Sequence, residues 1–248
     1  MRKLLFHASA LFLVIVFGET ARGQDDLRAV IDRAIRAHGG EDRLTKLQAT
    51  QVKIKGSIAF AGGVTFTQET SSQMPGKFRE VAELEVMEQK TTVVTVFDGE
   101  QGWLRAGRQT RRVDGDQLAE LQELSHLMRV SRLTPLKDKA YELASLGALR
   151  VEGRLTVGVK VTSKGHRDLK LYFDMETGLL AMVERRTRSA ATMKEVSEER
   201  IYAGYQDVDG LRMAQKVGVY HDGKKFMEVE VTKARALERL DESVFDRP

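Results

Sequence analysis

The sequence contains no cysteine, only three prolines and a single tryptophan among its 248 residues. A chain without cysteine cannot form a disulfide framework, a cysteine-ligated metal site or a thiol nucleophile. So few prolines exclude a collagen-like repeat. Hydrophobic residues make up 42% of the chain, which is near the average of globular proteins and argues against a disordered chain.

The sequence also lacks the short motifs of the common enzyme classes. It has no G-x-S-x-G nucleophile elbow, no P-loop, no H-E-x-x-H zinc motif and no dinucleotide-binding fingerprint. Residues 207–210 begin like a calcium loop, but no acidic residue closes the loop, and we expect a turn there. We therefore expect no enzyme activity, no cofactor and no metal site. The histidines lack the spacing of metal ligands and are expected at the surface: His38, His126, His166 and His221.

The first 23 residues are typical of a secretory signal peptide. Arg2 and Lys3 precede an apolar stretch at residues 4–17, and Ala21 and Gly23 are small residues suited to a cleavage site. The alternative is an uncleaved membrane anchor, but this stretch falls short of the roughly 20 apolar residues that span a bilayer. We predict cleavage of residues 1–23, a periplasmic location, and a single mature domain at residues 24–248.

The basic character of the chain decreases once this segment is removed. The full chain has a formal net charge of +4, and residues 1–23 contribute three basic residues and one acidic residue, a net of +2, so that +2 remains (4 − 2). So small an excess does not predict a track for nucleic-acid phosphates. An exported protein also seldom meets nucleic acid, and we expect no nucleic-acid partner.

The spacing of apolar residues predicts three helices. Asp25 or Asp26 is suited to cap the first helix, which Gly39 and Gly40 would end. Asp114 would cap the last one as part of a capping box. The predicted helices are residues 27–38, 41–47 and 114–133.

Elsewhere the apolar residues recur with a period of two, which is typical of strands with one buried face. Most connections between these strands are short enough for hairpins. Residues 141–149 are ambiguous. The predicted strands are residues 50–60, a return strand from residue 64, 78–86, 91–97, 103–104, 109–113, 155–162, 169–173, 179–186, 195–202, 211–220 and 226–236.

These patterns predict an α+β protein that is mostly β, with an incomplete, half-open antiparallel barrel covered by helices. A sheet that curls in this way fills its concave face with side chains or leaves a cavity there. An apolar concave face is therefore either ordinary core or a pocket for acyl chains, and the sequence alone does not separate the two. The candidate lining residues are Ile54, Ile58, Phe60, Phe66, Leu84, Val86, Trp103, Leu121, Leu124, Met128, Leu171, Phe173, Val217, Val219, Met227 and Val229.

Four segments resemble the LolA/LolB-like outer-membrane lipoprotein-sorting superfamily over roughly residues 27–248. They are Met-Pro-Gly-Lys-Phe-Arg at 74–79, Phe-Asp-Gly-Glu-Gln-Gly-Trp at 97–103, Tyr-Gln-Asp-Val-Asp-Gly-Leu at 205–211, and Asp-Glu-Ser-Val-Phe-Asp-Arg-Pro at 241–248. The resemblance implies a half-open barrel, lidded by helices, that receives acyl chains. Without a cysteine for lipid attachment, the chain is similar to the soluble carrier rather than the anchored receptor. Met74 stands where carriers commonly have a basic residue tied to lid opening.

The export signal, the half-barrel pattern and the resemblance together predict a periplasmic protein that binds lipoprotein acyl chains or another lipid, as an outer-membrane lipoprotein-sorting carrier. Its expected partners are lipid acyl chains or lipoproteins, an inner-membrane release complex and an outer-membrane receptor. We expect a monomer. The alternative is an envelope sensor or a protein-interaction module that uses the same fold without transporting lipid.

Overall fold

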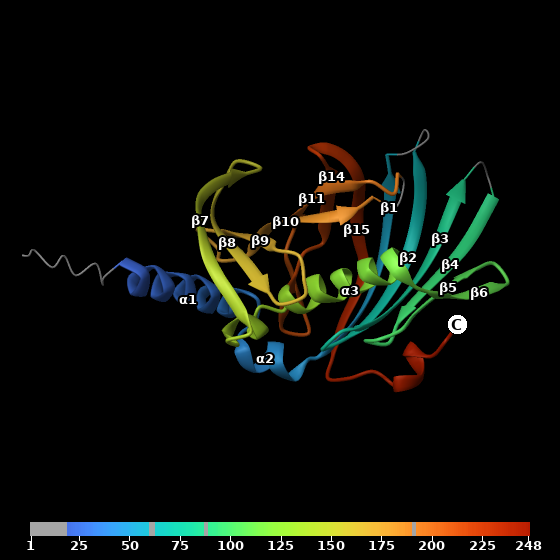
Figure 1. Ribbon diagram of the computed structural model, residues 1–248, viewed down its shortest axis with the longest axis horizontal. Helices are drawn as coiled ribbons and strands as arrows, with labels where there is room; N and C mark the ends of the chain where they lie inside the picture. The colour runs from blue at the N-terminus through green and yellow to red at the C-terminus, as the bar shows by residue number, and fades with distance from the viewer. Residues whose placement is uncertain (1–18, 60–62, 87–88, 190–191) are drawn as a thin grey trace, which may run out of the picture.

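The computed structural model describes residues 19–59, 63–86, 89–189 and 192–248 (Figure 1). None of the helices in these ranges is long and apolar enough to cross a membrane. The helical elements are α1 (Glu19–Ala37), α2 (Glu41–Lys46), α3 (Gly115–Val130) and the short 3-10 helices η1 (Thr134–Lys137) and η2 (Glu242–Phe245). The strands are β1 (Ala49–Ile58), β2 (Val64–Gln73), β3 (Lys77–Val86), β4 (Gln89–Phe97), β5 (Gly102–Ala106), β6 (Gln109–Val113), β7 (Tyr141–Val151), β8 (Arg154–Ser163), β9 (Leu169–Asp174), β10 (Leu180–Arg188), β11 (Glu195–Ala203), β12 (Gln206–Val208), β13 (Leu211–Met213), β14 (Lys216–His221) and β15 (Lys224–Leu237).

One antiparallel sheet of 13 strands forms the body of the protein, in the order β6-β5-β4-β3-β2-β1-β15-β14-β11-β10-β9-β8-β7. Most neighbours in this order are consecutive in the chain, because short hairpins join them. β1 pairs with β15, so the beginning and end of the chain meet in the middle of the sheet. The sheet is curved but not closed, since β6 and β7 are its two edges. This confirms the predicted mostly-β, half-open barrel with helices.

Helix α3 crosses the open side of the barrel (Figure 1). The chain leaves the sheet at edge strand β6 and re-enters it at the opposite edge, β7, so the connecting segment has to span the opening. Leu121 of α3 lies directly over Gly102 of β5, where an added Cβ would be 2.6 Å from Leu121 Cδ1. The face of the sheet that carries Gly102 is therefore the concave face beneath α3.

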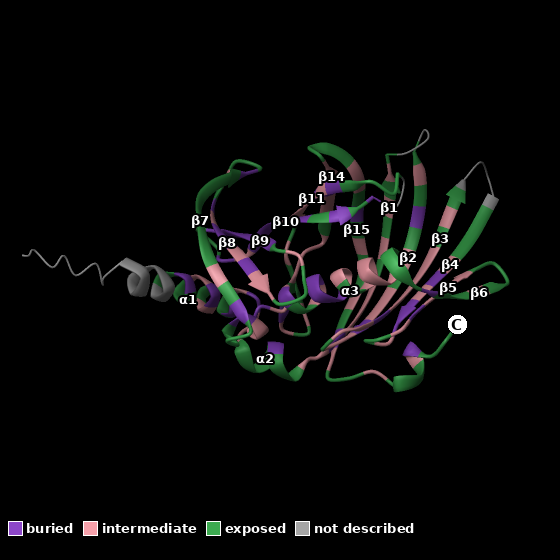
Figure 2. Cartoon of the chain, viewed as in Figure 1, coloured by how far each residue is buried: buried purple, intermediate pink, exposed green. Residues whose placement is uncertain are grey.

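Helix α1 packs on the concave side of the sheet against β8, β9 and β10. Leu27, Ile31, Ala34 and Ile35 recur on one face of the helix and are all buried. They belong to one apolar cluster with residues of β8, β9 and β10, and with the ends of α2 and α3. The buried residues in Figure 2 follow the same path through α1, β8 and β9. This half of the barrel is packed core.

A second, smaller cluster lies on the opposite, convex face of the sheet. Val96 of β4 is paired with Trp103 of β5, and their neighbours in sequence, Phe97 and Gly102, face α3 instead. Side chains alternate between the two faces of a strand, so Trp103 points away from the cavity side. Phe245 of η2 packs against it there. The predicted place of Trp103 on the concave face is wrong, and the C-terminal segment covers this residue from outside.

Several element boundaries differ from the prediction. Helix α1 begins at Glu19, so Asp25 and Asp26 lie inside the helix and do not cap it. Asp114 precedes α3 without a side-chain capping hydrogen bond. The ambiguous segment at 141–149 is strand β7. The single strand predicted at 211–220 is two strands, of which β13 pairs with β12 in a separate ribbon and β14 joins the main sheet.

Candidate functional site

A cavity of about 330 Å³ lies between α3, α2 and the concave face of the sheet. Its α3 wall is apolar and consists of Leu124, Leu127 and Met128. The facing wall comes from the central strands, including Val217 of β14 and Val231 of β15. The volume falls at the small end of the range typical of ligand pockets, and apolar walls of this kind are typical of such pockets.

Within the described part of the chain, the charged side chains that line this cavity are all arginines: Arg132, Arg200 and Arg212. Arg132 follows the end of α3, and its Nη2 donates to the carbonyl oxygens of Leu44 (2.9 Å) and Leu47. These bonds hold the end of α2 beside α3, since the last carbonyls of a helix have no partner within the helix. Burial lowers the pKa of Arg132 from its ordinary value.

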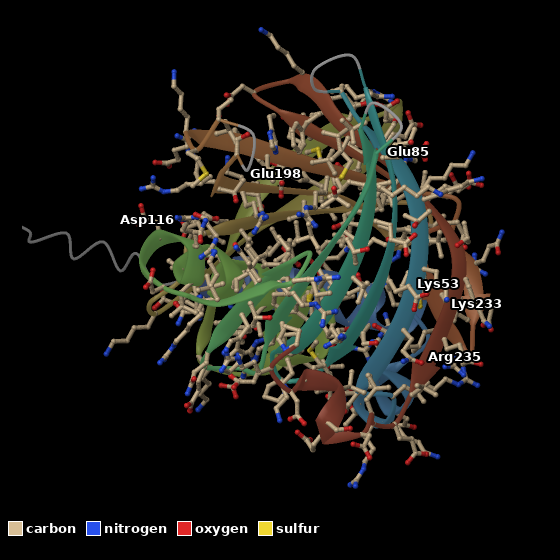
Figure 3. The ribbon with its side chains drawn as sticks, turned by 90° about the vertical axis from the view of Figure 1, so that its right-hand side faces the viewer. Lys53, Glu85, Asp116, Glu198, Lys233 and Arg235 are labelled. Atoms are coloured by element: carbon tan, nitrogen blue, oxygen red, sulfur yellow. The ribbon has the colours of Figure 1, made fainter. Side chains whose placement is uncertain are left out.

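Arg200 connects the cavity to a buried ionic network on β10 and β11. Glu198 Oε1 accepts hydrogen bonds from Arg185 Nε (2.7 Å) and Arg200 Nε (2.8 Å). The side chains of Arg185 and Glu198 are each 7% exposed. His221 Nε2 lies 3.4 Å from Glu198 Oε2. In Figure 3 Glu198 lies within the molecule, whereas Lys53, Lys233 and Arg235 lie along its outer rim.

The network determines the ionisation of Glu198. Burial by itself would raise the pKa of this carboxyl, but the positive charges of Arg200 and Arg185 outweigh burial and lower the pKa to about 2. Glu198 is therefore a carboxylate at neutral pH, shared by two guanidinium groups. Buried charges are stable only when they are paired in this way.

One side of α3 is held to the sheet by charged contacts. Asp116, Glu120 and Glu123 recur at helical spacing on α3. The Glu120 carboxylate lies 2.7 Å from Arg167 Nη1 and accepts a hydrogen bond from Thr187 Oγ1. Asp116 lies 3.3 Å from Arg188 Nη2, and Glu123 lies 3.2 Å from His166 Nδ1. The helix that covers the cavity is thus tied to β10 and to the loop before β9 by polar contacts.

The prediction of surface histidines is wrong for His38 and His126, which are both buried. His38 closes α1, where its Nδ1 contacts the carbonyl oxygen of Ala34 at 2.7 Å. His126 of α3 stacks on His166, with ring centroids 3.9 Å apart. Burial and the nearby charges of His166 and Arg129 lower the pKa of His126 to about 4.

We expect the buried His126 to make stability fall as the pH is lowered. Its pKa is about 4 in the folded chain and 6.5 as a model value, so the unfolded chain binds a proton first. The contribution of His126 to the free energy of unfolding is complete above pH 6.5 and decreases by roughly 2–3 kcal/mol as the pH falls towards 4. Urea unfolding at pH 7 and pH 4.5 measures the decrease. His126→Gln should reduce it, and an equal decrease in the variant would contradict the assignment.

The structure brings only some of the predicted lining residues into this cavity. Leu124, Met128 and Val217 line it. Leu171 and Phe173 are 0% and 1% exposed and belong to the core under α1, so they do not line it. Phe66, Leu84 and Val229 border a separate hollow of about 510 Å³, among lysines and glutamates. Phe60 lies outside the described residues, as does the side chain of Val86.

The remaining predicted residues lie on the concave face but outside the cavity lining. Leu121 packs over Gly102. Val219 of β14 is buried and is paired with Met227 of β15. Ile54 and Ile58 of β1 are half-buried. Together with Leu124, Met128 and Val217, these residues show that the concave face is apolar.

Arg132, Arg200 and Tyr202 are cavity residues that the sequence analysis missed. The signal for Arg200 is present in β11, where Val196, Glu198, Arg200 and Tyr202 alternate with exposed or half-exposed residues. Residues two apart share a face of a strand. An apolar residue at the start of this series indicates that the charged pair in its middle also faces inwards.

The fold class is defined by three features: an antiparallel half-barrel, a helix across its open side, and an apolar cavity beneath that helix. No protein-family model and no curated protein sequence matches the chain. Among the solved structures that match it, three with a TM-score above 0.5 cover 88% of its length. They are a DUF1329 family protein from Desulfovibrio piger (TM-score 0.58, 16% identity, 96% of that chain), a predicted outer membrane lipoprotein-sorting protein domain from Vibrio parahaemolyticus (0.56, 11%, 95%) and a LolA superfamily protein from Nitrosomonas europaea (0.55, 9%, 96%).

These similarities show that the chain has a LolA-like fold. The match extends over nearly the whole of each solved chain, so it covers the sheet and its helices together. At 9–16% identity the comparison concerns the fold alone.

Proposed function

We propose that this protein binds the acyl chain of a lipid or lipoprotein in the cavity beneath α3 and carries it through the periplasm. The cavity is the observation on which the proposal depends. Its walls are formed by Leu124, Met128 and Val217 and by further aliphatic side chains, and methionine and leucine adapt readily to a flexible chain. The LolA-like fold and the similarity to the Vibrio lipoprotein-sorting domain support the same reading.

Export by a cleaved signal peptide is part of this proposal. Burial within α1 is described from Asp26 onwards, and there the buried residues are Leu27, Ile31, Ala34 and Ile35. Processing after Gly23 would keep all four in the mature chain. The proposed mature protein has no cysteine for a lipid anchor and would diffuse with its cargo. An inner-membrane release complex and an outer-membrane receptor are the partners that such a carrier would need.

Leu124→Glu tests the proposal, because it places a charged group in the α3 wall of the cavity. We expect saturable binding of cis-parinaric acid, a fluorescent fatty acid, to the full-length protein, and at least about tenfold weaker binding to Leu124→Glu. Leu155→Glu is the matched control, since Leu155 is 44% exposed on β8, and it should bind like the unsubstituted protein.

Thermal unfolding of both variants shows whether they are folded. A folded Leu124→Glu variant that binds the probe as tightly as the unsubstituted protein would contradict the cavity as the binding site. If the unsubstituted protein binds no probe and releases no lipid on extraction, the carrier function itself is wrong. The interaction module without lipid transport would then be the remaining reading of the fold.

A further inference from the structure

The charges around the cavity beneath α3 have one sign. Arg132, Arg200 and Arg212 line it, and neither Asp nor Glu is among its lining residues in the described part of the chain. The hollow of about 510 Å³ is different, because Glu83, Glu85, Glu228 and Glu230 border it together with lysines. The cavity thus combines apolar walls with positive charge, and this combination fits an amphiphile with a negative head.

At ion-pair distance, the interior beside the cavity has two guanidinium groups for one carboxylate. Arg185 and Arg200 share the single carboxylate of Glu198. Arg185 is more than nine-tenths buried, and its Nη1 is buried without a hydrogen-bond partner. Arg132 Nε is likewise buried without a partner. A buried N–H group that loses water and finds no acceptor is costly, so these two nitrogens favour an anion nearby.

Arg200 is the member of the network that can reach a ligand. Its side chain is 24% exposed and lines the cavity, while its Nε is bound to Glu198. The pair with Glu198 fixes the direction of the guanidinium, and its two terminal nitrogens are suited to a carboxylate or phosphate.

Besides Arg185, Glu198 and Tyr202, whose phenol stays neutral because burial raises its pKa, two titratable groups lie close to Arg200 or to its partner. Glu80 of β3 interacts with Arg200 through space, but burial raises the pKa of Glu80 and weakens it as a counter-ion. His221 contacts Glu198 from the neighbouring strand β14. In the described residues, neither group forms an ion pair with Arg200, whose partner at ion-pair distance is Glu198.

We propose that the cavity selects an amphiphile with an anionic head, a carboxylate or a phosphate, which binds the terminal nitrogens of Arg200 while its chain lies against Leu124, Met128 and Val217. This inference rests on the proposed function and names its ligand class. Arg132 adds a second positive charge to the same cavity.

Ligands that share one chain and differ in the head test this inference on the full-length protein. Oleic acid and oleoyl lysophosphatidic acid supply a carboxylate and a phosphate, oleyl alcohol supplies a neutral head, and acetate and inorganic phosphate supply the heads alone. We expect both anionic amphiphiles to bind at least about tenfold more tightly than oleyl alcohol, because charge-assisted hydrogen bonds are stronger than neutral ones. The heads alone should bind at least about a hundredfold more weakly than the matching amphiphiles.

Variants of Arg200 test whether this side chain causes the preference for anionic heads. Arg200→Gln should remove most of the difference between oleic acid and oleyl alcohol, whereas Arg200→Lys should keep much of it. Arg235→Gln makes the same charge change on the outer face of β15 and should leave the difference unaltered. Since Arg200→Gln also breaks a bond to Glu198, its thermal unfolding is measured beside that of Arg200→Lys.

The outcomes separate this inference from the proposed function. Equal binding of oleic acid and oleyl alcohol by the unsubstituted protein would overturn the anionic head and leave the carrier function standing. Binding of none of the amphiphiles would overturn both. A preference for anions that persists in a folded Arg200→Gln variant would overturn the assignment to Arg200. Heads that bind as tightly without a chain would overturn the inference that the ligand is an amphiphile.

Discussion

Glu198→Gln is expected to lower the free energy of unfolding by about 3–5 kcal/mol. The carboxylate is 7% exposed and accepts hydrogen bonds from both Arg185 and Arg200. The amide is nearly the same size but uncharged, so two guanidinium groups would remain in the interior without a counter-charge. Such a loss is a large fraction of the stability of an ordinary domain. Urea unfolding at pH 7 measures it.

Glu195→Gln is the matched control for this substitution. Glu195 lies on the same strand and pairs with Arg186 at 2.9 Å, but both side chains are more than half exposed. Water already screens this pair, so its loss should leave the urea midpoint unchanged. If Glu198→Gln were as stable as Glu195→Gln, the buried network would not be a source of stability.

Glu198 also has a characteristic effect on acid unfolding. Its pKa is about 2 in the folded chain and 4.5 as a model value, so protons bind the unfolded chain first. The stabilisation is complete above pH 4.5 and is lost as the pH falls towards 2. This range lies below that of His126. Glu198→Gln should therefore flatten the decrease below pH 4.5, whereas His126→Gln should flatten the decrease above it.

Phe173→Ala and Leu124→Ala should separate the core of the protein from its cavity. Phe173 is 1% exposed and belongs to the cluster that α1 covers, so its truncation should cost about 3–5 kcal/mol. Leu124 is half-buried and borders the cavity, so its truncation should cost only about 1–2 kcal/mol, because space is already present beside it.

Binding should respond in the opposite order to stability. Leu124→Ala should change the affinity for cis-parinaric acid, and Phe173→Ala, studied at a temperature where it is folded, should not. Both effects are measured on the same preparations. If Phe173→Ala altered binding and Leu124→Ala did not, the ligand would occupy the half of the barrel under α1, and the cavity beneath α3 would be the wrong site.

The accuracy of the sequence analysis depended on how many faces of an element are buried. β1 alternates half-buried with exposed residues over most of its length, and β3 alternates apolar with charged residues in its sequence. Both were predicted to within two residues. β7 is an edge strand whose residues are mostly exposed on both faces, so it shows no alternation and stayed ambiguous. Its pairing with β8 establishes it as a strand.

The prediction of the site was weaker than that of the fold, for a related reason. Alternation assigns side chains to a face but does not say what lies opposite them. Phe173 and Val217 share the concave face, yet α1 covers the former and a cavity lies before the latter. Trp103 lies next in sequence to a residue of the concave face, and only the pairing of β4 with β5 places it on the convex side.

The sequence by itself predicts a curved antiparallel sheet. The alternating apolar residues and short turns that define each hairpin lie close together in the chain, so they can be recognised without the tertiary structure. The same local patterns predict the helix that follows β6. The tertiary structure decides which edge of the sheet the chain rejoins after that helix. Because this edge is β7, opposite β6, α3 crosses the open side of the barrel. The shared ion pairs of Glu198 and the positive lining of the cavity also arise only in the fold. The pairing of β10 with β11 places Arg185 beside Glu198, and Arg132, which follows α3, lines the same cavity as Arg200 of β11.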